Sequence, residues 1–241
     1  MGTDICFLQG FHLKAVTAKH FALPALDDLF WGEDAYSRGN PELIPEYGWN
    51  NEAGILYKTG NELIQVTHEI SVFRNKVHDL IIWLPGEEGK WIPENVNESI
   101  SRGLEFRGHI KREFTNSSLN LQYIYSYTRA LIWREGMPEQ SGTIRIYVPE
   151  HVASVSAGYR IRNFEIRYLQ SFTGKRYYDT HHTLDPYTLG DLFLNYNLKC
   201  NNICLTTYLK ILNLYNTSYQ AIRGYAQTPR SYALGINFSF K

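Results

Sequence analysis

Apolar and polar side chains alternate with a period of two along most of this sequence, and this alternation limits the fold more than any other feature. Four segments show it clearly: GLEFRGHIK from Gly103, LNLQYIYSY from Leu119, ASVSAGYRIR from Ala153 and DLFLNYNLK from Asp191. Successive side chains of a β-strand point to opposite faces of its sheet. Each segment therefore predicts a strand with one apolar face and one polar face. No helical stripe of comparable clarity occurs.

The last segment, SYALGINFSFK, repeats the pattern. One face carries apolar residues and the other carries small or polar ones; the apolar set is Tyr232, Leu234, Ile236, Phe238 and Phe240. We therefore expect the chain to finish on a strand that is apolar on one face.

The expected strands come in pairs separated by long polar segments. Short turns are predicted within 56–64, 110–120, 159–168 and 198–205. Long connections are predicted at 20–47, 84–100, 132–149, 173–188 and 215–230. The sequence therefore predicts roughly ten antiparallel strands joined alternately by short turns and long loops.

Two architectures are compatible with this layout: a soluble β-sandwich and a transmembrane β-barrel. The predicted strands run about 10–13 residues, whereas strands in globular proteins usually have about five or six. Their polar faces carry Glu, Arg, His and Lys, which suits a wet interior, and their apolar faces end in aromatic residues, as an interfacial girdle does. These features favour the barrel.

Composition excludes several classes of protein. The chain has 241 residues, and its 24 Lys and Arg balance its 24 Asp and Glu, so no net field attracts nucleic acid. No segment approaches the ~20 apolar residues of a membrane helix. The opening residues, MGTDICFLQGF, lack a basic region and a long apolar core, so we expect no signal peptide within the chain.

The chemistry-bearing residues do not form a catalytic pattern. Cys200 and Cys204 flank a predicted two-residue turn that would place Cys200 opposite Ile203, so we interpret them as ordinary strand residues. The adjacent pair His181–His182 is interpreted as part of a solvated loop. His109 shares a strand face with Arg107 and Lys111, and we interpret the three as part of the wall of the barrel lumen. We expect neither an enzyme nor a bound metal or cofactor.

Residues 21–55, FALPALDDLFWGEDAYSRGNPELIPEYGWNNEAGI, resemble a stretch in the barrels of TonB-dependent outer-membrane receptors. In that family an aromatic-x-x-Pro stretch leads through Asp-Leu-Phe to Gly-Asn-Pro-x-Leu-x-Pro-Glu and then to a Trp-x-x-Glu-x-Gly strand. The matching residues here are Phe21, Pro24, Asp28, Leu29, Phe30, Gly39, Asn40, Pro41, Leu43, Pro45, Glu46, Trp49, Glu52 and Gly54.

Three further segments resemble the family in its own order. They are VFRNKVHDLIIWLP (72–85), similar to a strand with an Asp-x-Ile-x-Trp-like motif; ENVNESISRGLEFRG (94–108), similar to an Asn-Val…Gly-x-Glu strand; and LKILNLYNTSYQAIRGYAQTPRSYALGINFSF (209–240), similar to the closing loop and last strand. The family often has Pro-Gly-Arg where this chain has Thr228-Pro229-Arg230. The likeness runs from about residue 10 to the end.

The resemblance implies an all-β fold: an antiparallel transmembrane β-barrel segment of roughly ten strands within a barrel of about 22. Short turns would be periplasmic and long loops extracellular. Such receptors import iron–siderophores, haem, cobalamin or glycans, with energy delivered by the TonB complex through an N-terminal plug domain. We expect residues 1–241 to be the C-terminal portion of such a barrel, without plug, TonB box or signal peptide.

The resemblance also implies roles for particular residues. The loop Gly39, Asn40, Pro41, Leu43, Pro45 and Glu46 carries the family motif, and we interpret it as a shaped loop rather than a ligand contact. Phe238 and Phe240 correspond to the C-terminal aromatic signal that barrel-assembly machinery reads. Separately, four loop aromatics are candidates for ligand contact, although stacking or girdle roles are favoured for them: Trp91, Tyr177, Tyr178 and Tyr219.

The expected partners follow from what a barrel segment needs. They are the N-terminal plug and barrel half, the TonB complex acting through that half, the assembly machinery and membrane lipid, in the outer membrane of a Gram-negative cell. Alone, the segment would have open edges near 10–20 and at 230–241, which a bilayer does not tolerate. Two alternatives stay open: a small complete barrel acting as a channel or adhesin, and a secreted carbohydrate-binding β-sandwich.

Overall fold

The computed structural model describes residues 2–86, 89–133, 142–200 and 203–240. Within them one antiparallel sheet dominates, and its strands are paired in chain order. They are β1 (Gly2–Leu8), β2 (Phe11–Ala22), β3 (Glu46–Gly60), β4 (Ile64–Pro85), β5 (Trp91–Glu113), β6 (Ser117–Trp133), β8 (His151–Ile161), β9 (Phe164–Thr173), β12 (Tyr187–Cys200), β13 (Ile203–Leu212) and β16 (Ser231–Phe240). The all-β antiparallel fold class predicted from the alternation is confirmed.

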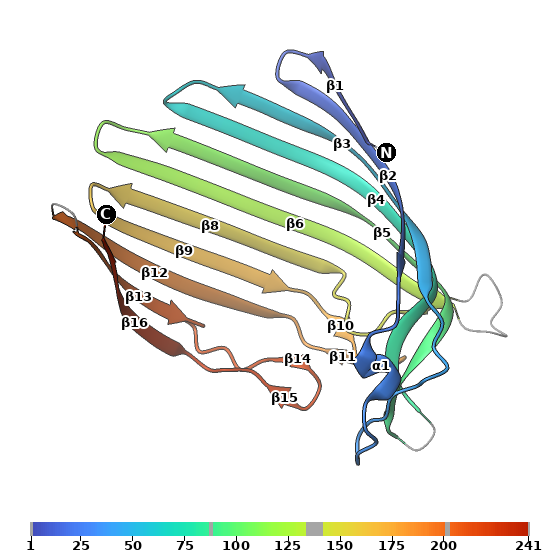
Figure 1. Ribbon diagram of the computed structural model, residues 1–241. Helices are drawn as coiled ribbons and strands as arrows, with labels where there is room; N and C mark the ends of the chain where they lie inside the picture. The colour runs from blue at the N-terminus through green and yellow to red at the C-terminus, as the bar shows by residue number, and fades with distance from the viewer. Residues whose placement is uncertain (1, 87–88, 134–141, 201–202, 241) are drawn as a thin grey trace.

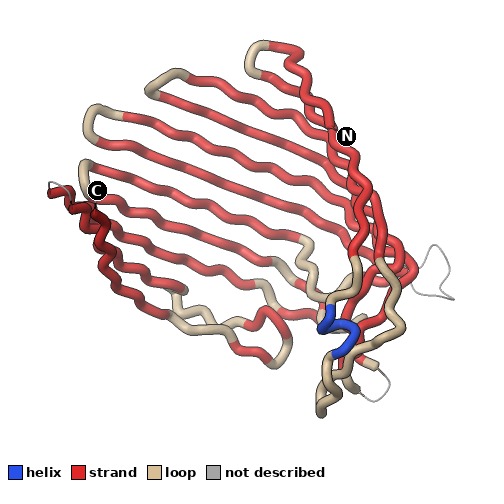
Figure 2. Tube along the Cα trace, in the orientation of Figure 1, coloured by secondary structure: helices blue, strands red, loops and turns tan. Residues whose placement is uncertain are grey.

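Smaller elements lie in the connections between these strands. They are the helix α1 (Leu26–Phe30), the strand β7 (Thr143–Ile144), which pairs with β6, and the two hairpins β10–β11 (Arg176–Tyr177 with Thr183–Leu184) and β14–β15 (Gln220–Ile222 with Tyr225–Ala226). These connections and the short turns lie at opposite ends of the strands (Figure 2). No helix in the described part of the chain is long and apolar enough to cross a membrane.

The sheet curves like part of a cylinder wall, with β1 and β16 at its two edges (Figure 1). The eleven strands of its main path, counted over the described residues, exceed the roughly ten expected. The prediction of an edge strand near 10–20 was wrong, because β1 pairs with β2 and forms the edge. Residues Ile5 to Leu8 are consecutively apolar, so this strand lacks the alternation that identifies the others.

The connection predicted at 84–100 was also wrong. β4 continues to Pro85, β5 begins at Trp91, and Pro85 pairs with Trp91. The alternation is lost here because Leu80 and Leu84 are buried in a cluster with Val96 and Ile132, while the indole of Trp83, between them, binds Asp28 of α1. β4 and β5, with 22 and 23 residues, are much longer than the ~10 residues that cross a membrane.

The register places the polar side chains on one face and the apolar ones on the other. His109 pairs with Gln122, which pairs with Ser156, while the apolar neighbours Ile110, Leu121 and Ala157 form the parallel row on the opposite face. Side chains crowd on the concave face of a curved sheet, and Ser71 and Ser118 of the polar set are buried. The polar face is therefore the concave one.

The apolar face is widely exposed. Its exposed residues include Leu13, Ile55, Ile70, Val72, Phe106, Leu119, Val155, Tyr196, Leu234 and Phe238. A β-sandwich would cover such a face with a second sheet, and no second sheet packs on it within the described residues. An exposed apolar face of this extent is typical of a surface that meets another apolar phase.

Candidate functional site

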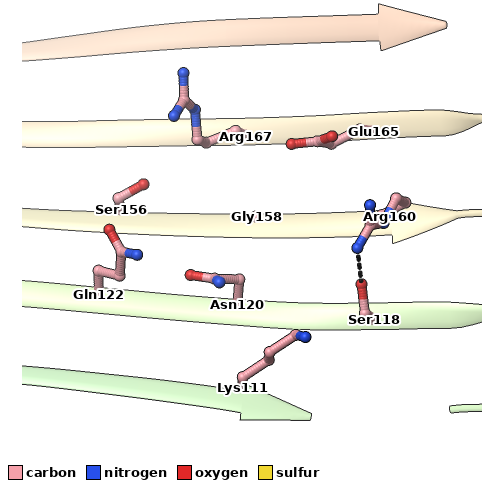
Figure 3. Close-up of a pocket in the computed structure, with 9 residues that line it drawn as sticks. All are labelled: Lys111, Ser118, Asn120, Gln122, Ser156, Gly158, Arg160, Glu165 and Arg167. Carbon is pink, nitrogen blue, oxygen red and sulfur yellow. Dashed lines mark hydrogen bonds between the residues drawn. The ribbon is translucent and has the colours of Figure 1, made fainter. Parts of the chain in front are cut away.

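The concave wall contains an open polar hollow between β5, β6, β8 and β9 (Figure 3). Charged side chains enter it from both sides, and the Arg160 guanidinium donates to the Ser118 hydroxyl at 3.4 Å. The complete lining is Lys111, Ser118, Asn120, Gln122, Ser156, Gly158, Arg160, Glu165 and Arg167. These donors and acceptors suit a hydrated passage for a hydrophilic solute.

Next to this hollow, ion pairs cross the wall from strand to strand. Glu69 on β4 accepts from Lys14 on β2 at 2.9 Å and lies 3.8 Å from Arg107 on β5. Arg107 also binds Glu105 at 2.7 Å. His109 contacts the amide of Asn120 at 3.1 Å. The interpretation of Arg107, His109 and Lys111 as wall residues agrees with this arrangement, because all three line the concave face.

The motif loop between β2 and β3 is tied to the extended ends of β4 and β5. The Asn40 amide donates to the Pro93 carbonyl at 3.0 Å, and its backbone N–H donates to the Asp28 carbonyl at 2.8 Å. Gly39 packs so closely that a Cβ there would lie 2.6 Å from the Trp31 nitrogen. The loop therefore requires glycine at 39 and an amide at 40.

Asn95 holds the second half of the motif loop. Its side-chain oxygen accepts from the Ile44 N–H, and its amide donates to the Ile44 carbonyl, both at 2.9 Å. The same amide donates to the Asp79 carbonyl at 2.6 Å. Asp79 has a φ of 54°, in the left-handed region. One asparagine thus satisfies the backbone of both the loop and a kinked strand.

Glu46 and Asp28 complete this junction. A Glu46 carboxylate oxygen accepts from the Ile81 N–H at 3.0 Å, and an Asp28 oxygen accepts from the Trp83 indole at 2.9 Å. Burial lowers the pKa of Arg145, and the charge of Glu46 opposes that shift. Leu43 is buried, while Pro41 and Pro45 are exposed. Parts of the first three motifs therefore meet at one place.

We name this place the loop junction: residues 28–46 with residues 79–85 of β4 and 91–95 of β5. Sequence reasoning identified the motif residues but missed two contacts between the motifs. Asn95 binds the backbone of Ile44, and the Trp83 indole binds the Asp28 carboxylate. The signal that could have revealed this was the pairing of separate motifs, each containing an Asn or Asp beside an apolar run.

The closing motif builds a similar structure beside β12. Asn213 is 4% exposed, and its backbone has a left-handed conformation (φ 53°). Its amide donates to the Thr217 and Thr228 carbonyls at 2.9 and 3.4 Å, and its oxygen accepts from the Thr217 N–H. The Asn216 oxygen accepts from the Arg230 N–H at 3.0 Å. These asparagines fix a connection that has little strand of its own.

Arg176, in the connection between β9 and β12, binds the connection between β13 and β16. The residue is 3% exposed, and its guanidinium donates to the carbonyls of Ala221, Asp185 and Gln220. The guanidinium also lies 5.0 Å from the ring centroid of Tyr187, which contacts Tyr219 at 4.4 Å. Burial is the main cause that raises the pKa of Tyr219. Tyr219 is therefore packed between two connections.

The three principal loop aromatics occupy different settings. Trp91 is not a loop residue: it opens β5, and its N–H and carbonyl bind Tyr36 and Arg38. Tyr177 belongs to β10, and its carbonyl accepts from the Tyr147 N–H. Tyr178 stacks on His182 at 5.7 Å, and Arg223 lies over its ring at 4.4 Å. The structure does not bring Trp91 together with the two tyrosines.

His181 and His182 lie in an exposed turn organised by Asp179. The Asp179 carboxylate accepts the N–H groups of both, at 2.8 and 2.7 Å, and contacts the His182 ring. The His181 bond is the largest cause that lowers the pKa of Asp179 to about 2. Within the described residues, no cluster of three or more His, Cys, Asp or Glu could hold a metal ion.

The remaining sequence-selected residues lie on strands. Cys200 pairs with Ile203 and Cys204 with Lys199, as the two-residue turn predicted, and Cys204 is a free thiol. Phe238 is outward and 60% exposed. The backbone of Phe240 pairs with Ile203, and its side chain lies outside the described part.

The sheet has a polar concave face and an apolar convex face, and side-chain hydrogen bonds hold its long connections in place. A chain of this kind matches a known family. The family model described as "TonB dependent receptor-like, beta-barrel" matches residues 7–214. The chain belongs to the TonB-dependent receptor β-barrel family. This family consists of receptors and transporters of the Gram-negative outer membrane. Its full-length members have a plug domain and interact with TonB.

Curated relatives of this TonB-dependent receptor chain cover most of its length. The vitamin B12 transporter BtuB of Vibrio vulnificus is 25% identical over 232 residues, which are 94% of this chain and 34% of that protein. BtuB of Photobacterium profundum is 27% identical over 226 residues, 91% of this chain and 34% of the relative. The chain thus spans about a third of the length of the curated relatives it matches.

Solved structures show the same fold. The copper transporter OprC aligns with a TM-score of 0.71 at 14% identity, covering 99% of this chain and 39% of OprC. The ferric-catecholate import receptor Fiu of Escherichia coli K12 aligns with a TM-score of 0.67 at 17% identity, covering 98% and 34%. The sheet therefore has the strand arrangement of part of a TonB-dependent receptor barrel.

Proposed function

We propose that residues 1–241 form the C-terminal part of the barrel of an outer-membrane receptor that imports a scarce nutrient with energy from TonB. The observation that carries this proposal is the two-faced sheet: an exposed apolar face to meet lipid and a charged, hydrated face to wall a passage. Cobalamin and siderophores are the nutrient classes that fit best, because BtuB is named as a vitamin B12 transporter and Fiu as a ferric-catecholate import receptor. Haem is the third class that the family resemblance implies.

In this proposal the chain does not transport alone. β1 and β16 each have one sheet neighbour in the described residues, and no backbone group stays unpaired in a bilayer. Further strands must therefore pair with the two edges of this sheet, and the plug domain must fill the barrel. Phe238 and Phe240 serve as the aromatic signal for the barrel-assembly machinery. The long connections face the outside of the cell.

Among the candidate contacts, Tyr177 and Tyr178 lie where an extracellular ligand arrives. The motif residues Gly39, Asn40, Pro41, Leu43, Pro45 and Glu46 act by holding the connection in place. Trp91 acts with them, because its backbone binds the same connection.

The experiment compares this chain with and without the rest of a receptor. Directed to the outer membrane together with a plug and the preceding barrel strands, it should show heat-modifiable migration, protease protection and nutrient uptake that disappears in cells lacking TonB. Produced alone, it should aggregate or require detergent. A stable, folded, water-soluble monomer would contradict the proposal.

A further inference from the structure

Three arginines lie side by side on the outward, apolar face of the sheet. Arg74 of β4 pairs directly with Arg102 of β5, and Arg102 pairs directly with Arg129 of β6. Directly paired residues put their side chains on the same face, and two strand spacings make the row about 10 Å wide. The row shares its face with the apolar pair Leu104 and Tyr127, two positions away on β5 and β6.

The three guanidinium groups have no partner among the residues that the structure describes. All three residues are exposed, and within the described part of the chain none of them forms an ion pair or a side-chain hydrogen bond. Glu98, an acidic residue further along the same face of β5, is already bound by Lys76 at 2.6 Å. Like charges directly opposite each other repel. The row therefore concentrates three positive charges that no carboxylate neutralises within the described residues.

The position of the row along the strands indicates which anion can reach it. Arg102 and Arg112 are ten positions apart on β5, which is about 33 Å along a strand. With the strand tilt of membrane barrels this becomes about 25 Å, the height of the outward apolar band. Between them the outward residues are Leu104, Phe106, Gly108 and Ile110. The row thus lies at the upper boundary of the band, on the side of the long connections.

We propose that Arg74, Arg102 and Arg129 bind the phosphate groups of a phosphorylated glycolipid, lipopolysaccharide, in the outer leaflet of the membrane. This inference rests on the proposed function, which places the long connections outside the cell. Guanidinium forks bind phosphate oxygens in a bidentate manner. A row about 10 Å wide accommodates a headgroup with two separated phosphates, and its acyl chains then lie along Val72 and Leu104.

The test measures the lipopolysaccharide that stays bound to the full-length receptor. The receptor is purified in detergent from outer membranes. Native mass spectrometry gives the ratio of bound lipopolysaccharide to protein. The variant R74Q/R102Q/R129Q should lower that ratio about tenfold, because three charge-assisted contacts are lost. The variant with lysine at the same positions should fall in between, since it keeps the charge but loses the fork.

The matched control removes the same charge at the other boundary. Arg112 lies on the same outward face as Arg102, ten positions along β5 at the short-turn end, so R112Q should retain lipopolysaccharide whereas R102Q should lose part of it. The inference is overturned if the arginine-row variant retains as much as the unmodified protein. It is also overturned if the control loses as much, or if phosphatidylglycerol displaces lipopolysaccharide at equal phosphate concentration. If the glutamine variant fails to show heat-modifiable migration, the lysine variant and R102Q alone decide.

A separate readout isolates the proposed function. Gly32 lies in the long connection after α1, where a new Cβ meets no atom within 4 Å. The variant Gly32→Cys should react with an impermeant thiol reagent on intact cells. Labelling without loss of lipid in the arginine-row variant defeats the lipid inference alone, whereas no labelling defeats the orientation on which the proposed function rests.

Discussion

At the scale of single residues, asparagine amides hold the irregular parts of this chain. Asn40, Asn95 and Asn213 each pair with backbone groups of segments that no strand ladder satisfies. Buried backbone N–H and C=O groups require partners, and an asparagine side chain offers both a donor and an acceptor. The family motif is thus explained by the backbone groups it satisfies.

Replacing Asn213 by alanine should lower the free energy of unfolding by about 1–3 kcal/mol. The change removes the bonds to Thr217 and Thr228 and leaves a non-glycine residue at positive φ. Denaturant unfolding in detergent measures the effect. Asn213→Gly, which suits the backbone but lacks the amide, separates the two causes.

Asn50 provides the control for that substitution. It lies exposed on the concave face of β3, and Asn50→Ala should change stability by less than about 0.5 kcal/mol. Equal effects at 50 and 213 would contradict the role assigned to the Asn213 amide.

The turn at Asp179 should be sensitive to strong acid. Hydrogen bonds from the backbone of His181 and His182 lower the pKa of Asp179 to about 2, below its ordinary 3.8. A depressed pKa means that the folded turn prefers the carboxylate, so its contribution is full above about pH 4 and is lost as the pH falls through about 2. An NMR titration of the Asp179 carboxyl carbon should have its midpoint near 2, and a midpoint near 3.8 would show that the turn does not form.

At the scale of elements, alternation predicted the strands that have one wet face and one apolar face. β6, β8, β12 and β16 are of this kind, and their sequence patterns gave both faces correctly. β1 and the far ends of β4 and β5 could not be predicted in this way. β1 has consecutive apolar residues, and Leu80 and Leu84 are buried while Trp83 between them binds Asp28, so neither has a period of two.

For the candidate site, sequence likeness predicted the motif residues but not the contacts between them. The bond between Asp28 and Trp83 joins residues 55 positions apart, and only the register of β3 to β5 brings them together. The arginine row is hidden for the same reason, because Arg74, Arg102 and Arg129 meet only when three strands are aligned.

β16 allows a test of the aromatic signal. Phe238→Ser should reduce insertion into the outer membrane several-fold, because it removes an outward aromatic residue that is 60% exposed. Quantitative immunoblotting of outer-membrane fractions measures the effect. Ser239→Ala, at the adjacent position on the concave face, is the matched control, and equal insertion of both variants would argue against a role for Phe238.

At the scale of the whole molecule, the curved sheet separates two environments. Nitroxide labels on Leu121→Cys and Gln122→Cys, with the native cysteines replaced by serine, sample adjacent positions on opposite faces. In the assembled receptor the label at 121 should be relaxed more by oxygen, which concentrates in lipid, and the label at 122 more by a water-soluble nickel complex. Protection of position 121 from both reagents would instead indicate a buried core.

The chain-order pairing of the strands has a kinetic consequence. Each short turn delivers a strand directly to its neighbour, so pairing can spread along the sheet by local steps with little loop-closure entropy. In a complete barrel the non-local event is the pairing of the free edge of Ser231–Phe240 with the first strand of the barrel, which the proposed function places outside this chain. Sealing of that seam, rather than formation of any individual hairpin, should set the rate at which a complete cylinder appears.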